Sequence, residues 1–140
     1  MLRRLSAFAA AAAMIGLCTL PASASTATPH ATTHTFTVPT IKNHNVVKAW
    51  GSYTRVNSAR VVVTVCAKQT GPAFAVGAIA VVSKANGASK NIAAVVLEQR
   101  VGTTFCGHMS FLFYTAHLKV YAFIGAGGRI IAKSAVKKIY

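Results

Sequence analysis

Histidine is the main candidate for acid–base chemistry in this chain, because the chain has one glutamate, Glu98, and no aspartate. A metal-independent ribonuclease needs only histidine, lysine and a groove for a polyanion, and His108, His117 and Lys119 could supply these groups. We keep this hydrolase as an alternative hypothesis. A scattered histidine is more often a polar surface residue, so we assign no catalytic residue.

The shortage of carboxylates excludes several kinds of site. One glutamate cannot form the carboxylate pair of a glycosidase, and calcium or magnesium would need several carboxylate ligands. Zinc needs three or four ligands, and the histidines are poorly placed to supply them. His30 and His34 are four residues apart in a segment rich in threonine and proline, and His44 is isolated. We expect no metal and no cofactor, and we expect Glu98 to form a structural ion pair.

The first 24 residues have the pattern of a secretory signal. Arg3 and Arg4 precede an apolar run over residues 5–20, which is short for a membrane span, and residues 22–24 (Ala-Ser-Ala) suit a signal peptidase. Cleavage after residue 24 removes Cys18 with the signal and leaves 116 of the 140 residues. We therefore predict a secreted, extracellular protein with no transmembrane segment after signal removal.

Two cysteines remain after that cleavage, Cys66 and Cys106, and an even pair in an exported chain predicts a disulfide. In the chain-entropy model such a bridge contributes about 4 kcal/mol. Its position suggests a link between two sheets. A reactive thiol beside His108 is the competing hypothesis. Trp50 precedes both cysteines, so the order typical of antibody domains is absent.

Short runs of β-branched and aromatic residues, separated by turn residues, follow residue 45. Residues 25–45 are rich in threonine and predict a flexible, extended tail or a first edge strand. The later runs cover residues 46–56, 60–68, 74–84, 90–98, a short segment around Cys106, 110–124 and 129–137, with turns at Asn57-Ser58 and Asn86-Gly87. We predict one all-β domain over residues 46–140. Its architecture is an antiparallel β-sandwich, immunoglobulin-like or a small barrel, with six or seven strands and one disulfide.

The last two runs place a constraint on the turn between them. Their even-numbered positions are mostly apolar: Leu112, Tyr114, Ala116, Leu118, Val120, Ala122, Ile124, Ile130, Ala132 and Val136, with Ser134 the exception. Both sets can face one core only if the numbers of paired residues have an even sum, which a two- or four-residue turn does not give. We predict a three- or five-residue connection or a bulge near residues 125–128, with a glycine at positive φ.

Charge is the strongest functional signal in the chain. The formal charge is +14, or +12 without Arg3 and Arg4, and such a field attracts polyanions. The odd positions of the last two runs combine cations with Tyr121 and Phe123, and rings beside lysines can bind a phosphate backbone. We predict a non-enzymatic domain that binds an anionic polymer or cell surface: wall teichoic acid, extracellular nucleic acid or acidic lipid. The predicted contacts are Lys119, Tyr121, Arg129, Lys133, Lys137 and Lys138. A protein-binding module, an inhibitor or toxin, is a further alternative.

Several features resemble small exported proteins of high-GC Gram-positive bacteria. They are the alanine-rich start that ends in Ala-Ser-Ala, the segment rich in threonine and proline, the strand Val61–Cys66, and the closing Tyr121…Gly128…Ile130 hairpin. Proteins of that kind are short, disulfide-stapled β domains, and most have no assigned activity. The resemblance therefore implies export and an all-β fold, and it transfers no functional residue.

Overall fold

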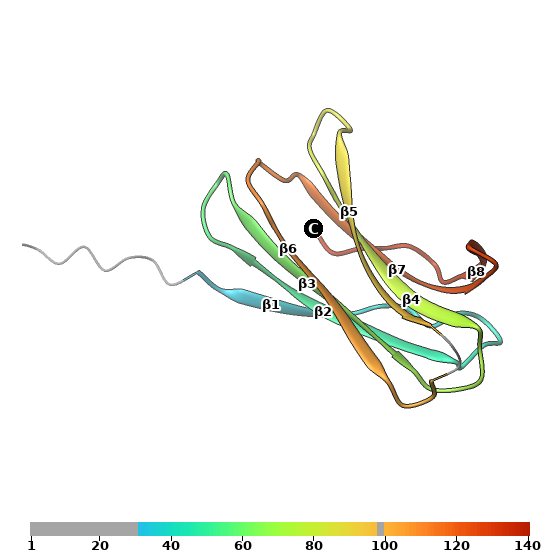
Figure 1. Cartoon of the computed structure of the whole chain (residues 1–140). Helices are drawn as coiled ribbons and strands as arrows, with labels where there is room; N and C mark the ends of the chain where they lie inside the picture. The colour runs from blue at the N-terminus through green and yellow to red at the C-terminus, as the bar shows by residue number, and fades with distance from the viewer. Residues whose placement is uncertain (1–30, 98–99) are drawn as a thin grey trace, which may run out of the picture.

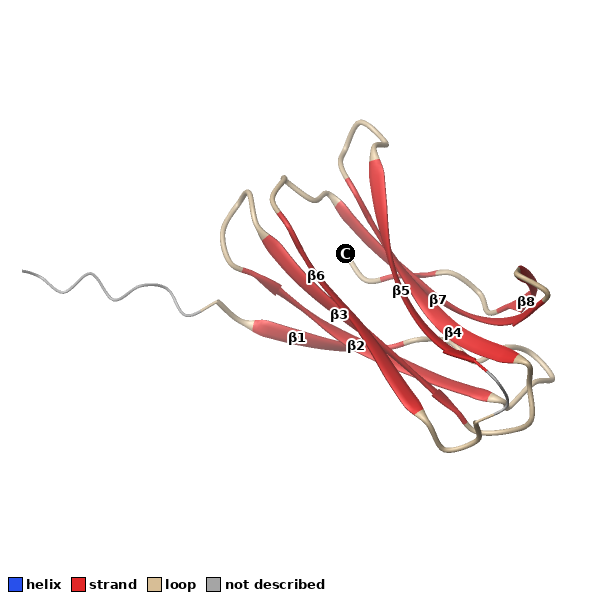
Figure 2. Ribbon diagram, viewed as in Figure 1, coloured by secondary structure: helices blue, strands red, loops and turns tan. Residues whose placement is uncertain are grey.

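The computed structural model describes residues 31–97 and 100–140, so the signal segment, His30, Cys18 and Glu98 lie outside the described residues. In the described part, nine strands form two antiparallel sheets that pack face to face (Figures 1 and 2). This confirms the predicted all-β sandwich, with nine strands rather than the six or seven expected. The strands are β1 Thr33–Thr37, β2 Val47–Arg55, β3 Val61–Gln69, β4 Ala75–Ser83, β5 Ser89–Leu97, β6 Thr104–Phe111, β7 His117–Ala126, β8 Arg129–Lys133 and β9 Lys137–Lys138.

The first sheet has the strand order β1-β2-β3-β6 and turns the odd-numbered residues of β2 and β3 toward the core. The odd positions of β3 from 61 to 67 are almost completely buried. Gly51 of β2 lies where a Cβ would meet the ring of Phe36, so the glycine lets β1 pack its ring against β2. β1 occupies part of the segment for which we expected a tail or a first edge strand, and it is an edge strand.

The second sheet has the order β5-β4-β7-β8, and β9 also pairs with β7. Its even-numbered residues face the core: positions 76–82 of β4 and 118–124 of β7 are at most 7% exposed. These residues alternate with solvent-facing neighbours in the period of two that the sequence shows. The two layers of valine, alanine, leucine and isoleucine side chains form the single core.

The predicted run 110–124 is in fact the end of one strand and most of another. β6 ends at Phe111, which pairs with Val61, the first residue of β3, so the ladder has no further partner residue. The chain then crosses to the second sheet, where β7 begins at His117. Leu112 and Tyr114 lie in this crossing and are 78% and 59% exposed. The prediction that these two residues face the core was wrong.

The hairpin between β7 and β8 contains the predicted bulge. Gly127 and Gly128 have φ values of 54° and 74° and form a tight turn, next to which Gly125 pairs with Ile130. The register then shifts, so that Ile124 pairs with Ala132. The shift restores an even sum between core-facing partners and confirms the bulge and the positive-φ glycines.

Residues on either side of the bulge differ from the prediction. Ile130 precedes the register shift and Val136 follows the end of β8, and they are 46% and 52% exposed rather than part of the core. Ser134, the expected exception, is instead buried. Its hydroxyl oxygen accepts a hydrogen bond from the backbone N–H of Ala122 at 3.0 Å. The backbone N–H of Ser134 also donates a hydrogen bond to the carbonyl oxygen of Ala122 at 2.9 Å, so Ser134 satisfies both backbone groups of Ala122 just after β8 ends.

The predicted disulfide joins Cys66 of β3 to Cys106 of β6, with a Cα–Cα distance of 4.0 Å. The two cysteines are direct register partners in one sheet, so the prediction of a link between two sheets was wrong. The spacing of the cysteines could not show that β6 returns beside β3. The bridge lies on the outer face of the first sheet, next to Trp50, which is the other register partner of Cys66.

An aromatic column packs beside the edge of the sandwich where β1 is the last strand. His34 of β1 stacks on Tyr53 with ring centroids 5.0 Å apart, and Tyr53 contacts the ring of Tyr140 at 4.8 Å. The guanidinium carbon of Arg55 lies 4.4 Å from the Tyr140 ring centroid. A 3.0 Å hydrogen bond joins the hydroxyls of Thr115 and Tyr140. The column ties the C-terminal residue to the first sheet.

Candidate anion-binding site

Four of the six predicted contact residues share the outer face of the second sheet. Lys119 and Tyr121 alternate with buried residues of β7 and therefore point away from the core. Lys138 is the register partner of Lys119, and Lys133 is that of Phe123, another odd-numbered residue of β7. Paired residues in an antiparallel ladder lie on the same face. This face thus combines three lysines with a tyrosine.

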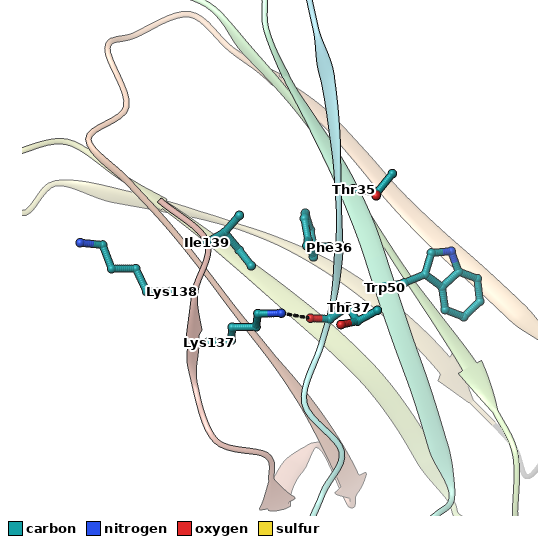
Figure 3. Close-up of a pocket in the computed structure, with 7 residues that line it drawn as sticks. All are labelled: Thr35, Phe36, Thr37, Trp50, Lys137, Lys138 and Ile139. Atoms are coloured by element: carbon teal, nitrogen blue, oxygen red, sulfur yellow. Dashed lines mark hydrogen bonds between the residues drawn. The ribbon is translucent and has the colours of Figure 1, made fainter.

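The other two predicted contacts are placed differently: Arg129 lies beside the hairpin turn at the end of that face, and Lys137 lies on the opposite side of the sheet. Arg129 pairs with Ala126 and Lys137 pairs with Val120, which are even-numbered positions of β7. Lys137 turns toward the first sheet, where its ammonium group donates a hydrogen bond to the carbonyl oxygen of Thr37 at 3.2 Å (Figure 3). The predicted basic strip is therefore divided between two sides of the molecule.

The contact between Lys137 and Thr37 borders a hollow of about 520 Å³. The hollow lies between the free edge of β1 and the C-terminal strand β9 (Figure 3). Figure 3 shows Lys137 reaching toward β1, whereas Lys138 extends away from it. The lining residues are Thr35, Phe36, Thr37, Trp50, Lys137, Lys138 and Ile139.

A second hollow of about 300 Å³ adjoins Trp50 on the outer face of the first sheet and is lined by Lys48, Trp50, Lys68 and Thr70. Lys48 and Lys68 are direct register partners on β2 and β3, and both are exposed. Like charges directly opposite each other destabilise a ladder. Residues 31–97 and 100–140 contain no aspartate or glutamate that could lie between them.

Trp50 lines both hollows and is half-buried. We name the two hollows together the Trp50 groove. It has Lys137 and Lys138 at one end and Lys48 and Lys68 at the other, with the indole between them. Ammonium groups on both sides of an aromatic ring can hold successive anionic groups while the ring stacks on a sugar or a base.

Lys48, Trp50 and Lys68 were not predicted from the sequence as site residues. A partial signal was available, because Lys48 and Trp50 are two residues apart and therefore on one face of a strand. Cys66 and Lys68 are also two residues apart and share a strand face. The missing information was the register that places Lys48 opposite Lys68 and Trp50 opposite Cys66, which no local pattern provides.

The histidines proposed for the alternative hydrolase lie on different sheets. His108 of β6 is on the outer face of the first sheet, where its Nδ1 is 2.8 Å from the hydroxyl oxygen of Thr64. His117 begins β7 in the second sheet and pairs with Ser83. The arrangement therefore does not bring His108 together with His117 and Lys119.

Neither a metal-binding cluster nor a membrane-spanning helix is found among the described residues. No group of three or more histidine, cysteine, aspartate or glutamate side chains is arranged to hold a metal ion in residues 31–97 and 100–140. No helix in these ranges has the length and hydropathy needed to cross a membrane.

Comparison of the chain with protein-family models, curated proteins and solved structures finds no match. The geometry of the site therefore carries the functional argument.

Proposed function

We propose that this protein is a secreted, non-enzymatic β-domain that binds an anionic polymer in the Trp50 groove. The observation that carries the proposal is the Lys48–Lys68 register pair beside the only tryptophan. A phosphate or sulfate between the two ammonium groups would replace their repulsion with charge-assisted hydrogen bonds. The neighbouring indole would stack on a sugar ring or a base of the same polymer.

The distribution of charge supports this proposal. Thirteen of the fifteen lysine and arginine residues lie in the described ranges, which contain no acidic side chain. So large an excess of positive charge attracts anions. A linear polymer suits the site better than a flat lipid surface, because the Trp50 groove is concave and has cations at both ends. Wall teichoic acid and extracellular nucleic acid have this repeating anionic chemistry.

The outer face of the second sheet offers the polymer a continuation. Lys138 lines the Trp50 groove and is also the register partner of Lys119. A chain that leaves the groove past Lys138 would meet Lys119, Tyr121 and Lys133 on that face. These residues are the contacts predicted from the sequence, and here they form a second, flanking set.

Export is part of the proposal. The Cys66–Cys106 disulfide is typical of oxidising compartments and supports it. We expect the protein recovered from culture fluid to lack the first 24 residues and to carry no free thiol. Intact-mass measurement before and after alkylation checks both points. A full-length chain retained inside the cell would contradict this part of the proposal.

A salt series with two matched variants tests the groove. Lys48→Gln/Lys68→Gln removes the register pair, and Lys84→Gln/Lys90→Gln removes the same charge at the β4–β5 turn of the other sheet. For a single-stranded polyanion, each lost phosphate contact reduces the slope of log affinity against log salt by about 0.7. We therefore expect the first variant to lower the slope for RNA by about 1.4 and the second to change it little.

The same series with purified teichoic acid identifies the preferred polymer. Equal losses in the two variants would show that the charge acts only as a general surface property, and the proposed site would then be wrong. Trp50→Ala is expected to weaken RNA binding by about 1–3 kcal/mol through lost stacking. Trp50→Phe retains a ring and should recover part of that loss.

A further inference from the structure

The outer face of the second sheet contains a groove of about 340 Å³ that lies apart from the Trp50 groove. Apart from Arg129, every side chain that lines it is apolar, or the residue is a glycine. The solvent-facing side of an antiparallel sheet is normally polar, so this face departs from the rule. The lining residues are Phe74, Ala75, Ile79, Ala93, Val95, Phe123, Gly125, Ala126, Gly128, Arg129 and Ile130.

The groove is concave because residues with little or no side chain lie between larger ones. Gly77 of β4 provides space for the ring of Phe123, which a Cβ at that position would meet. The ring is therefore only 7% exposed although it lies on an outer face. Phe74 and Ile130 remain 56% and 46% exposed at the margin. Phe74 and Ile130 therefore project beyond the small residues between them.

Cations lie around this apolar surface. Arg129 lines the groove, and Lys133 is the register partner of Phe123 within it. Lys119 lies four residues before Phe123 on β7, which is about 14 Å at the usual rise per residue. It is the register partner of Lys138. One sheet face therefore carries an apolar groove with positive charge at its margins.

We infer that this groove binds a single-chain anionic amphiphile, a long-chain fatty acid, with its alkyl chain over Ile79 and Phe123. Its carboxylate would lie at Arg129, with Lys133 as the second cation. Charge complementarity selects this ligand over a second copy of the chain, whose described charged side chains are all cationic. The inference does not rest on the polymer proposal, because the two grooves share no lining residue and only Lys133 of the flanking set is common to both proposals.

Calorimetric titration with decanoate, dodecanoate and tetradecanoate, each below its micelle concentration, tests the inference. We expect 1:1 binding and an affinity that rises by up to about 15-fold for each two methylenes added, while the chain still fits the groove. Dodecanol has the alkyl chain length of dodecanoate but no charge, so it separates the contribution of the chain from that of the carboxylate. Arg129→Gln should weaken dodecanoate binding by up to about fivefold, the scale of an exposed ion pair, and leave dodecanol binding unchanged.

Ala93→Phe fills the groove from an exposed position on the edge strand β5 and should abolish binding of all three acids. Ile79→Ala removes part of the groove lining and is expected to weaken the binding of all three acids. It provides an independent check. The inference is wrong if affinity does not depend on chain length, or if both variants bind as the parent does. It is also wrong if only anionic phospholipid vesicles bind, or if Ala93→Phe dissociates a dimer. Lys48→Gln/Lys68→Gln should leave fatty-acid affinity unchanged, so the two proposals can fail separately.

Discussion

Removal of the Cys66–Cys106 disulfide should destabilise this domain more than the loss of any single hydrogen bond on the same face. The bridge closes a loop with a sequence separation of 40 residues, for which the chain-entropy model gives about 4 kcal/mol. With a urea m-value of about 1–3 kcal/mol/M, this loss lowers the unfolding midpoint by about 1.3–4 M. We expect this shift between the oxidised protein and Cys66→Ala/Cys106→Ala, measured by far-ultraviolet circular dichroism.

The neighbouring row of the same ladder provides the control. Thr64 and His108 are register partners on β3 and β6, and a 2.8 Å hydrogen bond joins their side chains. Thr64→Ala/His108→Ala removes this contact without a covalent link and should cost about 1 kcal/mol. The chain-entropy reasoning is refuted if the disulfide variant loses no more stability than this control. Residual structure that holds β3 near β6 in the unfolded chain would produce that result.

Three further predictions concern stability and use the same urea assay. Leu118→Ala empties a fully buried position and should lower the free energy of unfolding by about 2–5 kcal/mol. Leu112→Ala changes a 78% exposed position and should alter it by less than about 0.5 kcal/mol. Similar losses in the two variants would contradict the placement of both residues. Gly77→Ala places a Cβ against the Phe123 ring and the Ala94 carbonyl and should cost about 1–3 kcal/mol, and an unchanged midpoint would contradict that packing. Tyr140→Phe keeps the aromatic column but loses the hydrogen bond to Thr115, so we expect a loss of about 1 kcal/mol, and no loss would mean that the bond contributes nothing.

The period of two in the sequence predicted which side of β7 is buried. It placed the even-numbered residues from Leu118 to Ile124 toward the core, because alternation is imposed by the strand itself. The parity of two apolar sets also predicted the bulge in the last hairpin. Local patterns were sufficient for these features, since each depends on neighbours in sequence.

Features that depend on pairing between distant strands were not predictable in this way. The end of β6 at Phe111 is fixed by the start of β3, fifty residues earlier in the chain. The position of the disulfide within one sheet has the same origin. The candidate site depends on it as well, because only the β2–β3 register places Lys48 opposite Lys68. Long-range register is determined by the packing of the whole sandwich.

The absence of acidic side chains from the described residues determines how their cations are held. Arg55 donates a hydrogen bond to the carbonyl oxygen of Thr115 at 2.9 Å and packs on an aromatic ring. Lys84 lies 5.0 Å from the centroid of the Phe113 ring. Such partners are neutral, so they position a cation without cancelling its charge, whereas a carboxylate would do both. The positive field of these residues therefore persists at the surface, where it attracts external anions.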